Sequence, residues 1–237
     1  ALTLDDLEPE TSRFNSLGNL GNILKKQGDY DGATRFLKKA MEINKGPYAN
    51  NVRYNLVLCL LNIGQEKEAL EHIDVLLGKQ PQNNRYLSTK GFILFIENDI
   101  EGALHYLRSA LTQNPHDMNT LLNLGMALSA MGAYEHSAWY LKRADEKSPR
   151  NLLILLSKLQ NAIKMQDEKR IRINLSHIAA LFSLQDIQRI LSEQAQGHHY
   201  IDNTLVDLDD CIVLPPLVDY FQQIAGEWVL DFADPTS

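Results

Sequence analysis

Asparagine recurs at two positions of a pattern that repeats along the chain. The first position is occupied by Asn15, Asn51, Arg85 and Asn119, and the second, four residues later each time, by Asn19, Asn55, Thr89 and Asn123. Six of these eight residues are asparagine in a chain that has 18 asparagines among 237 residues, far more than chance would place there. A side-chain amide has one acceptor and two donors. Residues four apart share one helix face, so a row of amides there could hold the backbone N–H and C=O groups of an extended peptide.

Local roles for these asparagines are the alternative. Asparagine costs roughly half a kcal/mol relative to alanine within a helix, so something should offset six of them. Residues of the first position fall in the first turn of a predicted helix, where asparagine can act as a cap. Polar residues on a solvated wall also need no ligand. Asn55 and Asn123 are predicted in mid-helix, where capping does not explain them, and there we favour peptide contact.

The elements that must position these amides are helical hairpins about 34 residues long. A small residue marks each predicted hairpin tip, at Gly28, Gly64, Asn98 and Gly132, with spacings of 36, 34 and 34 residues. Seven residues before each tip lies a second column, Gly21, Val57, Gly91 and Gly125. Five residues after each tip lies a third, Ala33, Ala69, Ala103 and Ser137. Small residues at fixed offsets let two helices approach closely, and the prolines at 81, 115 and 149 end the second helix of a hairpin.

These columns resemble the tetratricopeptide repeat family. The stretch from Leu20-Gly21 through Gly28-Asp29-Tyr30 to Gly32-Ala33 is close to the family pattern, as is Asn123-Leu124-Gly125 followed by Gly132-Ala133-Tyr134. The resemblance implies an all-α, right-handed α-α superhelical solenoid in which the first helix of each hairpin lines a concave groove. The groove residues that it implies are Asn15, Asn19, Asn22, Lys25, Asn51, Asn55, Arg85, Thr89, Asn119 and Asn123.

The predicted organisation is four repeats followed by a modified end. After an N-terminal lead-in at 1–13 we expect repeats at 14–47, 50–83, 84–117 and 118–151. Residues 152–185 have the size of a fifth hairpin, but Leu159 and Ile171 replace the small residues, as a solenoid end requires. Residues 186–237 are expected to form an extension with a loop at 197–214 and a C-terminal helix at 216–230. The apolar stripe from Leu217 to Trp228 would cap the array or bind a partner.

The predicted groove changes character along its length. Its first repeat offers Asn22, Lys25 and Lys26, whereas the second offers Tyr54 and Leu58. Such a surface suits a ligand with apolar anchors and an acidic end. Chaperone-binding members of the family grip a C-terminal carboxylate with a clamp of basic residues. We do not expect that clamp, because Gly18 and Thr89 occupy positions where those members have cations.

The amino-acid composition argues against nucleic acid as a partner and against membrane insertion. The formal net charge of −7 argues against nucleic acid, whose phosphates require clustered Lys and Arg. The longest apolar runs, such as residues 56–61, are far too short for a bilayer span, so we expect no direct membrane insertion. A cytoplasmic protein is favoured, and a soluble domain of a membrane-associated protein stays open, as does a homo-oligomer.

The sequence gives little evidence of catalytic activity. Cys59 lies in an apolar run and is predicted to be a core residue, while Asp209 and Asp210 would discourage nucleophilic use of Cys211. The seven histidines show no metal-binding spacing, and we interpret His198-His199 as surface residues. We therefore expect no enzyme activity, no catalytic residue, no metal and no cofactor.

Three classes of function remain. The first is a non-enzymatic adaptor that binds an extended peptide or a partner segment in the groove through the asparagine ladder. The second is a structural scaffold or self-associating module that uses the C-terminal helix. The third is the recruiting domain of a larger enzyme or membrane protein.

Overall fold

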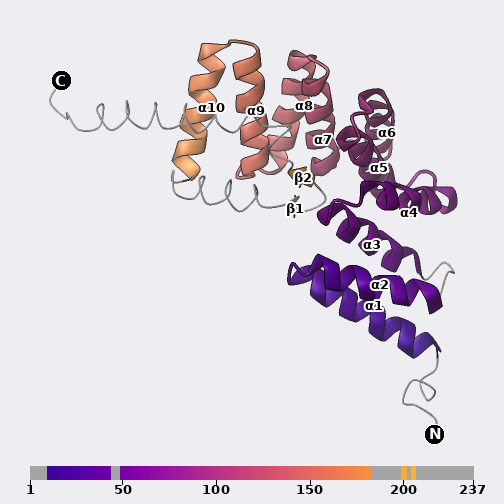
Figure 1. Ribbon diagram of the computed structural model, residues 1–237. Helices are drawn as coiled ribbons and strands as arrows, with labels where there is room; N and C mark the ends of the chain where they lie inside the picture. The colour runs from indigo at the N-terminus through magenta and orange to yellow at the C-terminus, as the bar shows by residue number, and fades with distance from the viewer. Residues whose placement is uncertain (1–9, 44–48, 183–198, 202–203, 207–237) are drawn as a thin grey trace, which may run out of the picture. The chain divides into compact units, whose positions relative to one another are not determined.

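Helical hairpins make up almost all of the computed structural model, which describes residues 10–43, 49–182, 199–201 and 204–206 (Figure 1). The first five helices are α1 (Glu10–Lys26), α2 (Tyr30–Ile43), α3 (Asn50–Asn62), α4 (Glu66–Lys79) and α5 (Asn84–Ile96). The next five are α6 (Ile100–Gln113), α7 (Met118–Ala130), α8 (Tyr134–Lys147), α9 (Leu152–Lys164) and α10 (Glu168–Leu181). The all-α repeat fold predicted from the sequence is confirmed.

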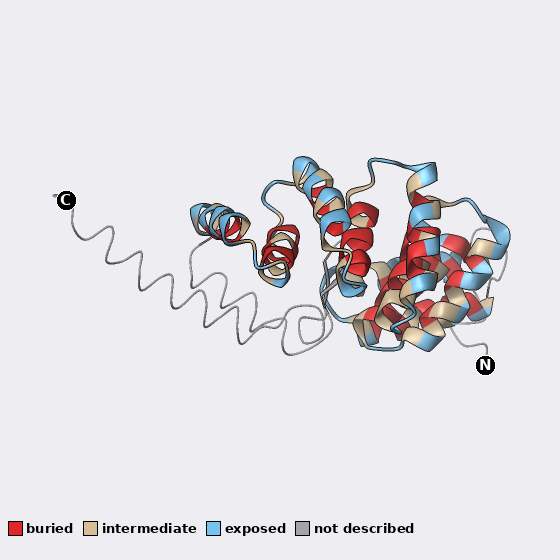
Figure 2. Cartoon of the chain, turned by 90° about the horizontal axis from the view of Figure 1, so that it is seen from above, coloured by how far each residue is buried: buried red, intermediate tan, exposed pale blue. Residues whose placement is uncertain are grey.

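The chain divides into two compact units, which are described separately. The first comprises Ala1–Leu124 with Tyr200–Leu205, and the second Gly125–His199 with Val206–Ser237. In the first unit α1 packs on α2, α3 on α4 and α5 on α6, and α2 and α4 also contact the helix that follows them. In the second unit α9 packs on both α8 and α10. In Figure 2 the helices carry buried and exposed residues on different sides, as expected of amphipathic helices in a layered array.

Each hairpin tip has a left-handed residue that explains the spacing of small residues. The backbone φ is 81° at Gly28, 69° at Gly64 and 80° at Gly132, while Asn98 and Gln166 adopt 62° and 54° without being glycine. The residue after each tip donates its backbone N–H to the carbonyl five residues earlier, as from Asp29 to Leu24 at 3.0 Å. This is the Schellman arrangement, which satisfies carbonyls at the end of the first helix. The tip residues are therefore required by backbone geometry.

The second column of small residues is explained by close packing inside the hairpins. A Cβ atom built at Gly21 would lie 2.6 Å from Cγ of Leu37, and one at Gly91 would lie 2.7 Å from Cγ of Leu107. Both leucines are fully buried. Glycine at these positions lets the second helix approach the first more closely than any side chain would allow.

Cys59 is fully buried in α3, within the apolar core of the first unit, and the prediction that it is a core residue is confirmed. Burial raises the pKa of its thiol to about 12. Because the thiolate is the reactive form, the folded protein should protect this residue from thiol reagents.

We expect a Cys211→Ser variant, which retains only Cys59, to resist labelling by a chromogenic disulfide reagent under native conditions. The labelling rate should rise with urea concentration, because only opening of the first unit exposes the thiol. Stopped-flow absorbance would measure the rate. Labelling of the folded variant as fast as that of the urea-unfolded chain would contradict the burial of Cys59.

The ends of the chain differ from the sequence-based prediction. Helix α1 begins at Glu10, inside the segment assigned to the lead-in. The loop predicted at 197–214 is wrong in part, because β1 (His199–Ile201) and β2 (Thr204–Val206) pair as a two-stranded sheet. Tyr200, Ile201, Thr204 and Val206 are of the aromatic and β-branched types that favour strands. The helix predicted at 216–230 lies outside the described residues.

Candidate functional site

The predicted groove residues of α1 differ in their exposure. Asn15 and Asn19 are exposed, whereas Asn22 and Lys25 are half-buried. The Oδ1 atom of Asn22 is buried and has no hydrogen-bond partner among the described residues. Lys25, in the last turn of the helix, is the residue of α1 that reaches the next repeat.

Lys25 joins α1 to α3 through the ladder itself. Its Nζ atom donates to Oδ1 of Asn55 at 2.6 Å, across an offset of 30 residues. Burial lowers the pKa of Lys25, and the positive charge of Arg85 lowers it further. Lys25 and Asn55 thus join the first helices of two successive repeats, and Arg85 on the first helix of the third is near enough for its charge to act on Lys25.

A second contact joins α3 to α5. The Tyr54 hydroxyl lies 3.0 Å from Oγ1 of Thr89, and the guanidinium carbon of Arg85 lies 4.7 Å from the centroid of the Tyr54 ring. The ring of Tyr86 packs against that of Tyr54 at a centroid distance of 5.3 Å. Tyr54 and Thr89 are each only 4% exposed. Burial raises the pKa of the Tyr54 hydroxyl.

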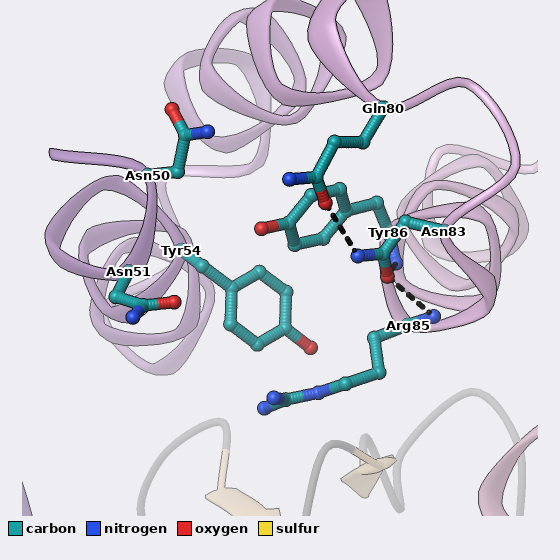
Figure 3. A pocket seen from close by; sticks show the side chains of 7 residues that line it. All are labelled: Asn50, Asn51, Tyr54, Gln80, Asn83, Arg85 and Tyr86. Atoms are coloured by element: carbon teal, nitrogen blue, oxygen red, sulfur yellow. Dashed lines mark hydrogen bonds between the residues drawn. The ribbon is translucent and has the colours of Figure 1, made fainter. Parts of the chain in front are cut away.

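Beside these contacts lies a pocket of about 340 Å³ (Figure 3). It is lined by Asn50, Asn51, Tyr54, Gln80, Asn83, Arg85 and Tyr86. The first two residues belong to the start of α3 and the last two to the first turn of α5, while Gln80 and Asn83 come from the connection between α4 and α5. Asn51 and Arg85, which the sequence places at equivalent positions of successive repeats, thus line one pocket.

The remaining predicted residues lie in α7. Asn119 is half-buried, and Asn123 is 1% exposed. Neither amide atom of Asn123 has a hydrogen-bond partner among the described residues. The structure thus brings together Lys25, Asn51, Asn55, Arg85 and Thr89, and it buries Asn123 away from any surface.

Four pocket residues were missed by the sequence analysis: Asn50, Gln80, Asn83 and Tyr86. Asn83 carried a usable signal, because an asparagine just before a predicted helix is a good N-cap. Its Oδ1 accepts from the backbone N–H groups of Arg85 and Tyr86 at 3.1 and 3.4 Å. Gln80 carried no such signal, because it lies at the end of α4 and outside the first helices on which the groove was placed.

Among the residues that the structure describes, no group of three or more His, Cys, Asp or Glu side chains could hold a metal ion. Among the same residues, none of the helices combines the length and the apolar character needed to cross a bilayer.

Hairpins that recur every 34 to 36 residues and pack on one another within each unit define a helical repeat protein. Residues 24–91 match the family model of the tetratricopeptide repeat. These residues are therefore identified as tetratricopeptide repeats, and the resemblance seen in the sequence is confirmed. This fold supports a role as a protein–protein interaction module, and repeats of the family are typically non-catalytic.

Two curated proteins with sequence similarity are much longer than this chain. One is the BBSome complex member BBS4 of Bos taurus, 29% identical over 139 residues, which covers 57% of the chain and 26% of the relative. The other is the tetratricopeptide repeat and J domain-containing co-chaperone DNJ1 of Cryptococcus neoformans, 24% identical over 185 residues, which covers 73% of the chain and 35% of the relative. The chain thus spans about a quarter to a third of their lengths.

Solved structures with the same fold include bacterial proteins. PilF of Pseudomonas aeruginosa superimposes with a TM-score of 0.63 at 18% identity, covering 93% of this chain and all of that one (100%). MamA residues 41 to the end from Desulfovibrio magneticus RS-1 gives a TM-score of 0.61 at 18% identity, covering 71% of this chain and 94% of that one. At these identities the likeness establishes the fold.

Proposed function

We propose that the chain is an adaptor that binds an extended peptide, or an extended segment of a partner protein, along the first helices of its first three repeats. The observation that carries this proposal is the meeting of side chains from α1, α3 and α5, in which Lys25 contacts Asn55 at 2.6 Å and Tyr54 contacts Thr89 at 3.0 Å. A peptide lying across three helices would meet these groups in succession.

The hydrogen-bonding capacity that remains on these groups suits a peptide backbone. Oδ1 of Asn55 accepts from Lys25, which leaves the amide N–H groups of Asn55 to donate to a peptide carbonyl. Asn51 is exposed, and its side chain has no hydrogen bond among the described residues, so it can offer both a donor and an acceptor. The rings of Tyr54 and Tyr86 add apolar surface between the polar groups.

The proposed site is shorter than the ladder expected from the sequence. Asn123 contributes no surface, since it is 1% exposed, and the proposal therefore places the principal contacts on Lys25, Asn51, Asn55 and Arg85. Asn15 and Asn19 are exposed on α1 and would extend the site toward the N-terminus for a longer ligand.

The test is a selection from a random peptide library, run in parallel on the wild type and on an Asn51→Ala/Asn55→Ala variant. We expect a shared motif to be enriched on the wild type and to bind the variant at least about tenfold more weakly, since each lost hydrogen bond contributes about 1 kcal/mol. Binding of the enriched peptide is measured by fluorescence anisotropy.

The matched control carries two substitutions on the second helix of the same hairpin. Lys67 and Glu71 are exposed on α4, so Lys67→Ala/Glu71→Ala should bind like the wild type. A selection that enriches no motif on the wild type would rule out the groove. The next hypothesis to test would then be a scaffold role for exposed apolar residues such as Trp139, which is 54% exposed.

A further inference from the structure

Asn50, Gln80 and Asn83, which line the pocket of Figure 3, use their amide oxygens in hydrogen bonds within the protein. Oδ1 of Asn83 accepts from the backbone N–H groups of Arg85 and Tyr86, and backbone N–H groups can only donate, so the orientation of this amide is fixed. Its Nδ2 atom must then be the donor to Oε1 of Gln80, at 2.8 Å. The acceptor oxygens of both amides are therefore occupied.

The same reasoning applies to Asn50 at the opposite side of the pocket. The ammonium group of Lys79 donates to Oδ1 of Asn50 at 3.2 Å, and an ammonium has no acceptor. With these oxygens engaged, the N–H groups of Asn50 and Gln80 are donors that a ligand can use. In Figure 3 both nitrogens are directed toward the space between the side chains.

Tyr86 supplies an independent indication that the pocket receives a ligand. Its side chain is 6% exposed, and its hydroxyl has no hydrogen-bond partner among the described residues. In Figure 3 the hydroxyl points into the space between Asn50, Tyr54 and Gln80. Because this hydroxyl opens on the pocket, it can donate a hydrogen bond to a ligand that binds there.

The charge on the lining of the pocket is positive. Its lining contains the Arg85 guanidinium and no carboxylate, and no ion pair links Arg85 to a carboxylate of the described residues. Asn50 and Asn51 open α3, and Arg85 and Tyr86 lie in the first turn of α5, so the positive ends of two helix dipoles add to the field. A ligand that accepts hydrogen bonds and carries negative charge suits the Arg85 guanidinium and the N–H groups of Asn50 and Gln80, and the N–H groups of Asn51 can donate to it as well.

We propose that this pocket takes the carboxylate of an aspartate or glutamate side chain from the bound peptide. The inference rests on the proposed function and names the side chain that would anchor the peptide. A planar carboxylate can accept two parallel hydrogen bonds from Arg85, and Tyr86, Asn50 and Gln80 offer further donors on the lining of the same pocket. The pocket volume of about 340 Å³ is ample for a glutamate side chain.

The experiment uses the full chain and a phage-displayed library of random nonapeptides. Its readout is the ratio of Asp plus Glu to Asn plus Gln at each position of the enriched, aligned motif, because these pairs differ in charge and hardly in shape. On the wild type we expect a preference of about tenfold or more for the acids at one position. Arg85→Gln should bring that ratio close to one, and Tyr86→Phe, which removes a single oxygen, should lower it several-fold.

The control is Tyr140→Phe, the same loss of one hydroxyl from α8 outside the pocket, which should leave the ratio unchanged. An enriched motif that is indifferent between acids and amides at every position would overturn the carboxylate pocket and leave the peptide groove standing. Tighter binding of phosphoserine peptides than of the corresponding glutamate peptides would also overturn the carboxylate pocket. If no motif is enriched on the wild type, both proposals fail.

Discussion

Gly91→Val should lower the free energy of unfolding of the first unit by about 3 kcal/mol, the upper end of the usual cost of overpacking a core. The first added carbon would lie 2.7 Å from Cγ of Leu107 and 3.1 Å from the backbone oxygen of Ala103. Leu107 is fully buried and cannot turn away, and a backbone oxygen moves only if α6 moves. Urea unfolding followed by circular dichroism would measure the loss.

Gly78→Val is the matched control, because it makes the same chemical change on an exposed helix surface. A Cβ atom at Gly78 meets no atom within 4 Å, and Gly78 lies inside α4. Replacing a helical glycine there should be neutral or slightly stabilising, since glycine is the poorer helix former. Equal unfolding midpoints for the two variants would show that the α5–α6 approach does not require glycine.

Asn161→Ala and Asn123→Ala should change stability in opposite directions, although both side chains are 1% exposed. Oδ1 of Asn161 accepts from Oγ of Ser129, and its Nδ2 donates to Oγ of Ser137, each at 2.6 Å. Removing that amide takes the acceptor from the Ser129 hydroxyl and a donor from the buried Ser137 hydroxyl, so the second unit should lose about 2 kcal/mol. Removing the unpartnered amide of Asn123 abolishes an existing desolvation cost, so that variant should gain about 1 kcal/mol.

Thermal and urea unfolding of the two variants would be compared with the wild type under one set of conditions. Ser129→Ala provides a further check, because it removes one of the two short hydrogen bonds to Asn161 and should cost less than Asn161→Ala. A loss of stability in Asn123→Ala as large as that in Asn161→Ala would mean that the Asn123 amide is satisfied.

The hairpins could be predicted from the sequence because backbone geometry demands particular residues at the tips. A left-handed residue after the first helix favours glycine or asparagine, and Gly28, Gly64, Asn98 and Gly132 supply it at intervals of 34 to 36 residues. Gln166 shows the limit of this rule. It adopts a φ of 54° without being either residue type, and its place could be inferred only from the apolar stripes on both sides.

Contacts between side chains that are far apart in the chain could not be predicted from the sequence. Ser137 occupies a column of alanines, and nothing in its own repeat indicates that it contacts Asn161, 24 residues later in α9. Asn55 and Asn123 occupy the same position of the repeat, yet one is half-buried beside Lys25 and the other is buried without a partner. The repeat period gives the helix face, whereas burial depends on the neighbours that pack over it.

The pocket was predicted only in part for a related reason. Asn51 and Arg85 lie on first helices, where the groove was expected, but Gln80 and Asn83 come from the connection between two repeats. That connection takes its conformation from the Asn83 cap and from the Gln80 hydrogen bond. Such contacts depend on loop conformation, which has no periodic signal in a sequence.

The types of donor group in the pocket determine how ligand binding should depend on pH and on ionic strength. Burial raises the pKa of the Tyr86 hydroxyl, so it keeps its proton at neutral pH, amides do not titrate, and a guanidinium stays charged. Between about pH 6 and pH 8 neither the pocket nor a carboxylate ligand changes its charge. A change of pH within this range would therefore leave capture unaffected, whereas ionic strength, which screens the attraction between guanidinium and carboxylate, would tune it.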